Sequence, residues 1–385
     1  MKFGLLYELE VPKPWSPNSE YDIFHQAADQ AVYAEQMGFD YCWIVEHHFL
    51  EEFAHSSGPE VWLGYLAART SIMRMGHGVV LLEGTINHPI RVAERIATLD
   101  IMSNGRAEFG TGRSSNPFQL EPFGADLMTT REEWEEALEI IPKAWADGWF
   151  SYKGRFWDIP ERNVLPKPVQ KPHPPIWVAC QQPETFKIAG RKGIGALCFT
   201  VGPPGQLAER IASYREAIVD APEQVGAFKN EQVGAFTVAH CDENDRTARE
   251  TAGPQATWYF DTIKKIYDPV WQQWKDKTIP PSYQYHALNV SNAESQRGGV
   301  GRKYADRLDP ETLIDNGSFC IGDPDACIKT IEMYEAAGVD QMLALLQVGN
   351  VPHEKIMNSL RLYGKYVIPH FKEKEKAAKA AAAIG

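Results

Sequence analysis

The chain has 385 residues, of which 44% are hydrophobic and 23% are charged. This composition is typical of a folded globular protein and provides enough chain for one large domain or two ordinary ones. The formal net charge of −12 argues against nucleic acid or an anionic membrane as a partner, because the overall field would repel either. A small anionic ligand held in a local basic pocket is compatible with this charge.

The six cysteines lie far apart and form no Cys-x-x-Cys pair. Most of them stand in apolar runs, which is typical of buried thiols in a reducing compartment and not of a disulfide framework. The amino terminus has no long apolar core, and no apolar run approaches the ~20 residues that a membrane span needs. The sequence therefore predicts a soluble cytoplasmic protein.

Apolar, strand-like runs alternate with helical patterns along the chain. The predicted strands cover residues 2–7, 41–45, 75–82, 107–111, 176–179, 195–200, 233–240 and 341–346. Eight repeats of strand and helix predict an α/β fold, a (β/α)8 or TIM barrel. An open doubly wound sheet is the alternative, but it would carry a Gly-x-Gly-x-x-Gly turn after its first strand. Here that turn is rich in proline.

We expect a single barrel domain over residues 1–370 and an exposed helical tail over residues 371–385. Three insertions are expected in the barrel, at about residues 114–130, 148–175 and 267–310. The second holds six prolines, which predicts an extended excursion with a small hairpin. The third is long, aromatic and rich in Pro, Ser, Asn and Gly, which is typical of a lid before the last barrel unit.

The second predicted strand ends in Glu46-His47-His48. The carboxyl ends of barrel strands form the mouth in which catalytic groups are placed. Adjacent strand residues point to opposite faces, so one imidazole can face the mouth, where its pKa suits proton transfer. The alternatives are histidines satisfied by backbone carbonyls and a metal site with Glu51 and His55. No metal is predicted, because the pair lacks i, i+4 spacing and no distant ligands complete a sphere.

Two further strands end in elements that suit a phosphate group. One ends at Gly112-Arg113, which combines a forked guanidinium with a glycine that allows close approach. The other passes through residues 179–182 into a helix whose free N–H groups, with Thr185, can hold an anion. A surface ion pair for the arginine and ordinary capping of the helix are the alternatives. Two such elements at one mouth favour an anionic ligand.

Together these motifs resemble the bacterial-luciferase-like family of flavin-dependent monooxygenases. The resemblance covers about residues 1–260 and 315–370. The matching motifs are Glu46-His-His-Phe49, Gly76-His-Gly-Val-Val80, His88-Pro-Ile-Arg-Val-Ala-Glu94, Leu99-Asp-Ile-Met-Ser-Asn-Gly-Arg106, Phe109-Gly-Thr-Gly-Arg113, Glu121-Pro-Phe-Gly124 with Arg131, Pro174-Pro-Ile-Trp-Val-Ala179, Pro183-Glu-Thr185, Ile321-Gly-Asp-Pro-Asp325 and Ala337-Gly-Val-Asp340.

The resemblance implies a barrel that binds reduced FMN at its carboxyl mouth and, with O2, oxygenates a small organic substrate through a flavin peroxide. By match to the family's motifs, His47 is the catalytic histidine and His48 its supporting neighbour. Arg113 would meet the flavin phosphate, and Gly78-Val79 would be a step that relatives can carry as a non-prolyl cis peptide under the isoalloxazine. The turn that would cradle the phosphate consists of Ala179, Cys180, Gln181, Gln182 and Thr185.

The chain carries no nucleotide-binding fingerprint of its own. A separate NAD(P)H:flavin reductase is therefore expected to supply the reduced flavin in a two-component system, and the family analogy suggests a homodimer. The alternative within the fold is an oxidoreductase that transfers hydride with the deazaflavin F420. A metal-dependent barrel hydrolase and a non-catalytic flavin-binding protein are the alternatives outside this chemistry.

Overall fold

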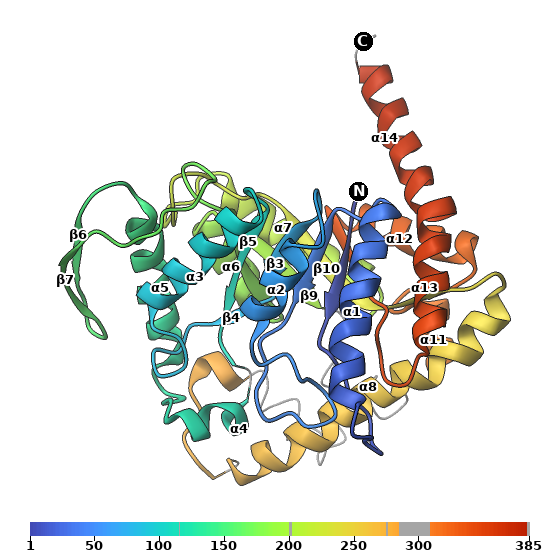
Figure 1. Cartoon of the computed structure of the whole chain (residues 1–385), viewed down its shortest axis with the longest axis horizontal. Coiled ribbons are helices and arrows are strands. Elements are labelled where there is room, and N and C mark those ends of the chain that lie inside the picture. Colours follow the sequence, from blue (N-terminus) through green and yellow to red (C-terminus); the bar gives the residue numbers. More distant parts are fainter. Residues whose placement is uncertain (115, 200–201, 275, 285–308, 383–385) are drawn as a thin grey trace.

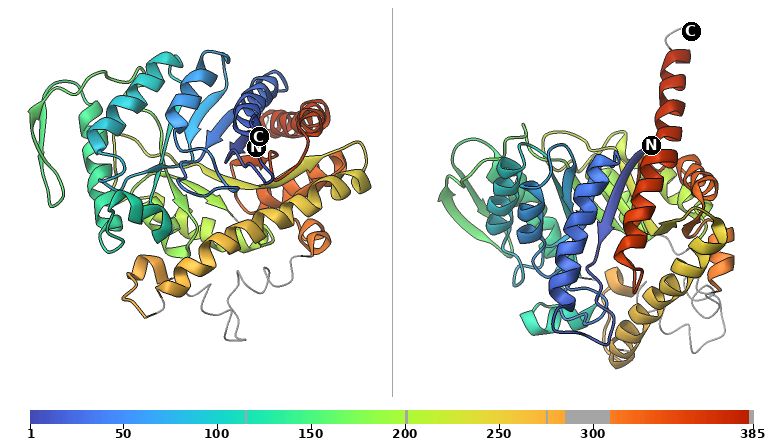
Figure 2. Two further views of the ribbon diagram at one scale, coloured as in Figure 1. Left: turned by 60° about the horizontal axis from the view of Figure 1, so that its bottom comes forward. Right: turned by 45° about the vertical axis from the view of Figure 1, so that its right-hand side comes forward.

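The computed structural model describes residues 1–114, 116–199, 202–274, 276–284 and 309–382. Parallel strands close into a ring, each bonded to the next and the last to the first. Their order is β1 (Lys2–Tyr7), β2 (Tyr41–Ile44), β3 (Arg74–His77), β5 (Ala107–Gly112), β8 (Ile176–Cys180), β9 (Gly195–Phe199), β10 (Val233–Cys241) and β12 (Gln341–Leu345). The prediction of a TIM barrel is confirmed (Figure 2).

Helices surround the ring and lie against its outer face (Figure 1). Several of them begin with proline, whose fixed φ suits the first helical turn and whose missing N–H leaves no donor unsatisfied there. The surrounding helices are α1 (Ser19–Gln36), α2 (Pro59–Ala67), α3 (Pro89–Met102), α5 (Thr130–Trp145), α6 (Pro183–Arg191), α7 (Gly205–Ile218), α8 (Asp245–Gln273), α12 (Pro324–Ala336) and α13 (His353–Leu362).

The barrel interior is packed with side chains and is not an open pore. Leu6, Trp43, Trp177, Leu197 and Leu343 form a buried cluster of inward-facing residues. A Cβ atom added to Gly76 would lie 2.2 Å from the Trp43 ring, so this strand position has to be glycine for the indole to fit. Because Leu6 and Trp43 point inward, every second residue beyond them along β1 and β2 also faces the barrel axis.

Three local predictions need correction. The strand predicted over residues 75–82 is two strands, β3 and β4 (Val80–Leu81), and the Gly78–Val79 peptide between them is cis. A short strand that was not predicted, β11 (Cys320–Gly322), pairs with β10 beyond the ring. The pattern Thr130-x-x-Glu133 predicts a capping box for a helix over residues 131–145; this prediction is wrong, because Thr130 is already helical and its hydroxyl accepts a hydrogen bond from Arg113.

The three predicted insertions contain short elements of their own. The proline-rich excursion carries the expected hairpin, β6 (Phe150–Lys153) with β7 (Asp158–Arg162), which extends away from the barrel in Figure 1. The first insertion holds the short helices α4 (Pro117–Leu120) and η1 (Glu121–Phe123). Of the region expected to be a lid, residues 267–273 continue α8 and residues 281–284 are helical; residues 285–308 lie outside the described residues.

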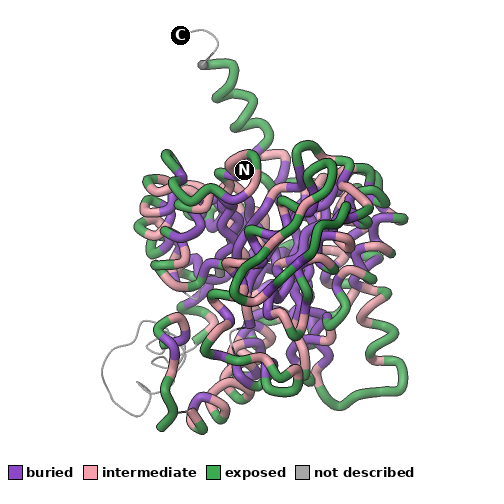
Figure 3. Tube along the Cα trace, turned by 90° about the vertical axis from the view of Figure 1, so that its left-hand side faces the viewer, coloured by how far each residue is buried: buried purple, intermediate pink, exposed green. Residues whose placement is uncertain are grey.

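The last helix among the described residues is α14 (Ile368–Ala382), which follows α11 (Pro310–Asp315), α12, α13 and η2 (Tyr363–Val367). Phe371 is buried against Phe3 at a ring separation of 5.5 Å, and residues 372–381 are exposed. Figure 3 shows this contrast between the buried strands and the exposed end of α14. All six cysteines are free and buried, as predicted. No helix among the described residues is long and apolar enough to cross a membrane.

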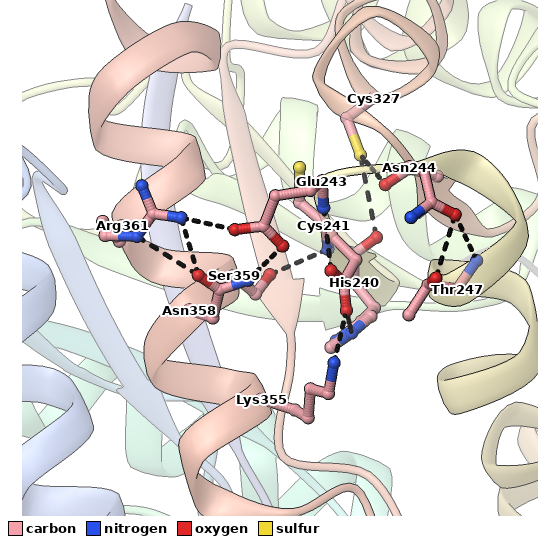
Figure 4. A network of polar contacts seen from close by, with 12 residues as sticks. His240, Cys241, Glu243, Asn244, Thr247, Cys327, Lys355, Asn358, Ser359 and Arg361 are labelled. Atoms are coloured by element: carbon pink, nitrogen blue, oxygen red, sulfur yellow. Dashed lines mark hydrogen bonds and ion pairs between the residues drawn. The ribbon is translucent and has the colours of Figure 1, made fainter.

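Polar contacts fasten the end of β10 to α13 (Figure 4). The Ser359 hydroxyl accepts a hydrogen bond from the Cys241 amide at 2.8 Å, and the Lys355 ammonium donates to Asp242 at 3.0 Å. Arg361 pairs with Glu243 at 2.6 Å. These bonds fix α13, in the last barrel unit, against the end of β10.

Candidate functional site at the carboxyl mouth of the barrel

His47 follows β2 at the mouth of the barrel, four residues after Trp43. If the alternation of β2 continues past its end, His47 is on the same inward side as Trp43. Its Nδ1 lies 3.2 Å from Oε1 of Gln119, an oxygen that also accepts the His48 amide at 3.0 Å. Because this oxygen can only accept, Nδ1 of His47 carries the proton and Nε2 keeps its lone pair. Gln119 therefore sets the tautomer that a proton acceptor needs.

Burial lowers the pKa of His47 to about 4, although the bond to Gln119 acts in the opposite direction and His48 adds to the lowering. His47 is therefore uncharged at neutral pH. An uncharged imidazole can accept a proton at Nε2, but it cannot begin a reaction as a cationic acid.

The His48 ring has a different partner from that of His47: its Nε2 lies 3.3 Å from Oε1 of Glu46. Glu46 is buried and also accepts from the Leu81 amide and the Asn87 amide group, each at 2.8 Å. These bonds tie the end of β2 to β4 across the Gly78–Val79 step. The sequence pattern Glu-His-His thus separates into one imidazole held by Gln119 and one carboxylate–imidazole pair.

The floor of the mouth beside His47 is made of small residues. A Cβ atom added to Gly110 would lie 1.9 Å from the His77 carbonyl oxygen, and one added to Gly112 would lie 2.4 Å from Val79. Ala179, at the end of β8, is exposed although its strand neighbours are buried. The glycines of β5 let the backbone around Gly78 and Val79 lie close against β5. With no side chain between them, this part of the mouth suits a planar ring.

Two guanidinium groups lie on one side of the mouth. Arg113 donates to the Thr130 hydroxyl at 2.8 Å and stacks over Tyr283 at 4.9 Å. Arg131, on the first turn of α5, has its pKa lowered by burial and by the positive charge of Arg113. Among the described residues, neither guanidinium lies within ion-pair distance of a carboxylate, although Glu184 on α6 and Glu135 on α5 attract Arg131. Two cations held close together without an ion pair suit an anion with two charges.

In the turn after β8, several polar groups are already engaged in contacts of their own. The Cys180 thiol is buried and contacts the Val178 carbonyl, so only its backbone can contribute to the mouth. The Gln181 carbonyl accepts from Arg210, and the Gln182 side chain donates to the Ser282 carbonyl at 3.1 Å. Gln182 is the N-cap of α6, Pro183 has no N–H, and the Thr185 amide donates to the Gln182 carbonyl at 3.0 Å. The Glu184 amide and the Thr185 hydroxyl are therefore the groups at this helix start that can hold an anion.

Several residues at the mouth were not assigned a role by the sequence. Gln119 lies in the first insertion and Tyr283 in the third, and no local pattern marks either of them. Thr130 was assigned to a capping box. Arg131 belongs to one of the motifs that match the family, and this match was the only sign in the sequence that it could have a role. Within the described ranges, no group of three or more His, Cys, Asp or Glu side chains is placed to hold a metal ion.

Two buried carboxyl groups follow β1 at the same end of the barrel. Glu8 accepts from the Tyr259 hydroxyl at 3.0 Å, and Glu10 accepts from the Gly349 amide at 2.5 Å. Each keeps one buried oxygen without a hydrogen-bond partner in the described part of the chain. Burial raises the pKa of Glu8 to about 8, and burial together with the neighbouring Glu8 raises the pKa of Glu10.

Glu8→Gln is expected to change how the stability of the fold depends on pH. The folded chain holds the Glu8 proton up to about pH 8, whereas the unfolded chain releases it near the ordinary value of 4.5. The folded state therefore binds more protons in this window, and its stability falls as the pH rises through it. Urea unfolding should show Glu8→Gln to be more stable than the parent at pH 8 to 9 and similar at pH 4. Glu20→Gln, on exposed α1, should show no such trend.

A closed parallel barrel whose carboxyl mouth combines an uncharged imidazole, a flat floor and an arginine pair defines an enzyme-like site for a planar, anionic ligand. The chain belongs to the luciferase-like monooxygenase family, whose model matches residues 1–341. The resemblance found in the motifs is thus confirmed.

Known relatives extend over nearly the whole chain. The oxygenase component of flavin-dependent trigonelline monooxygenase from Acinetobacter baylyi is 23% identical over 383 residues, which cover 97% of this chain and 96% of that protein. An F420-dependent glucose-6-phosphate dehydrogenase from Amycolatopsis mediterranei is 24% identical over 323 residues, covering 82% and 86%. The crystal structure of monooxygenase RslO1 from Streptomyces bottropensis matches with a TM-score of 0.74 and 25% identity, covering 96% and 100%. The family therefore contains oxidoreductases that use either flavin or F420.

Proposed function

We propose that this protein is the oxygenase of a two-component, FMN-dependent monooxygenase that oxygenates a small organic substrate with O2. The observation that carries the proposal is the pair Arg113 and Arg131 beside the amino terminus of α6. Two guanidiniums, one of them oriented by the Thr130 hydroxyl, together with the Glu184 amide and the Thr185 hydroxyl at the start of α6, suit the dianionic monoester phosphate at the end of FMN.

The other parts of the mouth suit the rest of the cofactor. The backbone at Gly78–Val79, kept bare by Gly110 and Gly112, would support one face of the isoalloxazine. Reduced flavin, when bound, supplies the electrons that activate O2. The protein's own contribution is to hold the ring, exclude water and manage protons. His47 would accept a proton at Nε2 while Gln119 holds its other nitrogen.

His48 would act as a supporting residue. Its contact with Glu46, and the contacts of Glu46 with Leu81 and Asn87, hold the end of β2 beside the cofactor floor. The name of the trigonelline relative describes an oxygenase component, which supports a separate NAD(P)H:flavin reductase as the source of reduced FMN.

The second candidate is hydride transfer with F420, the cofactor given in the name of the dehydrogenase relative. A direct experiment separates the two. Purified protein is supplied anaerobically with reduced FMN or reduced F420, binding is measured for each, and O2 is then admitted. Micromolar or tighter binding of reduced FMN, with O2 consumption at a rate above that of free reduced FMN or with a stabilised oxygenated flavin spectrum, supports the proposal. Tight binding of F420 alone would replace it with hydride transfer.

A further inference from the structure

A small polar cavity lies behind the barrel wall, between the β3–β4 segment and helices α2 and α3. Its volume is about 10 Å³, which is room for one water molecule. Polar groups from four separate segments reach it, so a water inside would find several hydrogen-bond partners. The residues that line it are Glu46, Glu60, His77, Val80, Asn87, Val92, Arg95 and Ile96.

His77 gives a separate sign that this cavity is occupied. The residue is 2% exposed, and its Nδ1 has no hydrogen-bond partner among the residues that the structure describes. Burial lowers the pKa of His77 to about 4, so the ring is neutral and needs both a donor and an acceptor nearby. Buried polar atoms are nearly always hydrogen-bonded in native proteins, to ordered water where no side chain is available.

A chain of polar contacts beside the cavity leads from the protein surface to His48. Glu60, 29% exposed, accepts from Arg95 at 2.6 Å. Arg95 donates to the side-chain oxygen of Asn87 at 2.5 Å. The side-chain NH2 of Asn87 donates to Glu46, which contacts His48. This chain of contacts cannot itself pass protons, because arginine keeps its proton at any working pH and an amide does not exchange one readily. Glu60, His77 and Glu46 can exchange protons, and all three line the cavity.

We propose that one water molecule occupies this cavity and carries protons between Glu60 at the surface and the Glu46–His48 pair at the mouth. The water takes a proton from Glu60 and gives another to Glu46, so that its own composition is unchanged; the reverse transfer returns a proton to solvent. His77 holds the water in place through a ring nitrogen. The other charged groups near Glu46 are Arg95, which lines the same cavity, and the buried Glu83.

The relay depends on the proposed function in one respect only: oxygenation at the mouth is the reaction that would use the proton. A mouth closed over its reactants would exclude the bulk water that usually exchanges protons with catalytic groups. A path through the barrel wall lets the mouth stay closed while a proton passes to or from the Glu46–His48 pair. It also explains why a carboxylate and a neutral histidine are buried behind the floor of the site.

The first test is a high-resolution crystal structure of the cofactor-free protein. We expect a single ordered water within about 3 Å of a His77 ring nitrogen and of carboxylate oxygens of Glu60 and Glu46. An empty cavity overturns the relay whatever the kinetics show. Because this measurement uses no cofactor, it is independent of whether reduced FMN or F420 is the natural one.

The second test is Glu60→Gln, which keeps an oxygen to accept from Arg95 but removes the exchangeable proton. Turnover with reduced FMN and O2 should fall about tenfold, less than for the loss of a direct acid–base group, and should recover on addition of formate or imidazole as a small proton carrier. Glu94→Gln, which removes a surface partner of Arg91, is the matched control and should behave as the parent. An unchanged rate, or a loss that no buffer restores, overturns the relay. A parent that consumes no O2 overturns the proposed function instead, and the crystallographic result then decides the cavity.

Discussion

Replacing His47 by alanine is expected to lower productive oxygenation by ~10²–10⁴-fold, the usual contribution of a positioned acid–base group. Reduced FMN should still bind with nearly unchanged affinity, because the arginine pair and the floor of the mouth are separate from this side chain. Stopped-flow measurement of product formed per flavin oxidised checks both quantities in one experiment. Uncoupled hydrogen peroxide should take the place of product.

His47→Asn is the more conservative variant, since its amide can still donate to Gln119 but offers no ring nitrogen as a base. It should lose as much activity as His47→Ala. His25→Ala, an exposed histidine on α1, should behave as the parent protein. If flavin affinity and turnover fall together in both His47 variants, His47 is a binding residue and its assigned role is wrong.

The low pKa of His47 also fixes the sign of its pH dependence. An activity that needs the uncharged ring should be steady from neutral pH downward and should fall only as the pH approaches about 4. His47 is already uncharged at the pH at which an exposed histidine would be half protonated, because burial disfavours the imidazolium.

Arg113→Ala is expected to weaken FMN binding by about 100-fold and riboflavin binding hardly at all. The estimate comes from the loss of about 3 kcal/mol, the value of one or two hydrogen bonds to a charged group, at 1.4 kcal/mol for each tenfold change in affinity. Titration of the variant with each ligand, followed by flavin fluorescence or calorimetry, measures the difference directly.

Arg131→Ala should show the same selectivity for FMN over riboflavin, because it lies on the first turn of α5 beside Arg113. Arg91→Ala is the control, since that arginine is 67% exposed and pairs with Glu94 on the outer face of α3. Equal weakening of FMN and riboflavin by Arg113→Ala would mean that the arginine holds the ring or the fold and not the phosphate.

The sequence by itself determined the barrel and the location of the mouth. Strand and helix periods are local properties, and eight alternations leave few topologies in which each strand can be covered by a helix. The same logic placed His47 and Arg113 at strand ends, since parallel strands bring all their carboxyl ends to one face. The motif match to Gly78-Val79 agreed with the cis peptide that the structure contains.

Only the tertiary structure decided how these residues act. Gln119 reaches His47 from 72 residues away, and Tyr283 packs against Arg113 from another insertion, so no local pattern could pair them. Burial, which lowers the pKa of His47 and raises that of Glu8, depends on the packing of the whole mouth. The cavity behind Glu46 likewise exists only where α2, α3 and the barrel wall meet, because its polar groups come from segments distant in the chain.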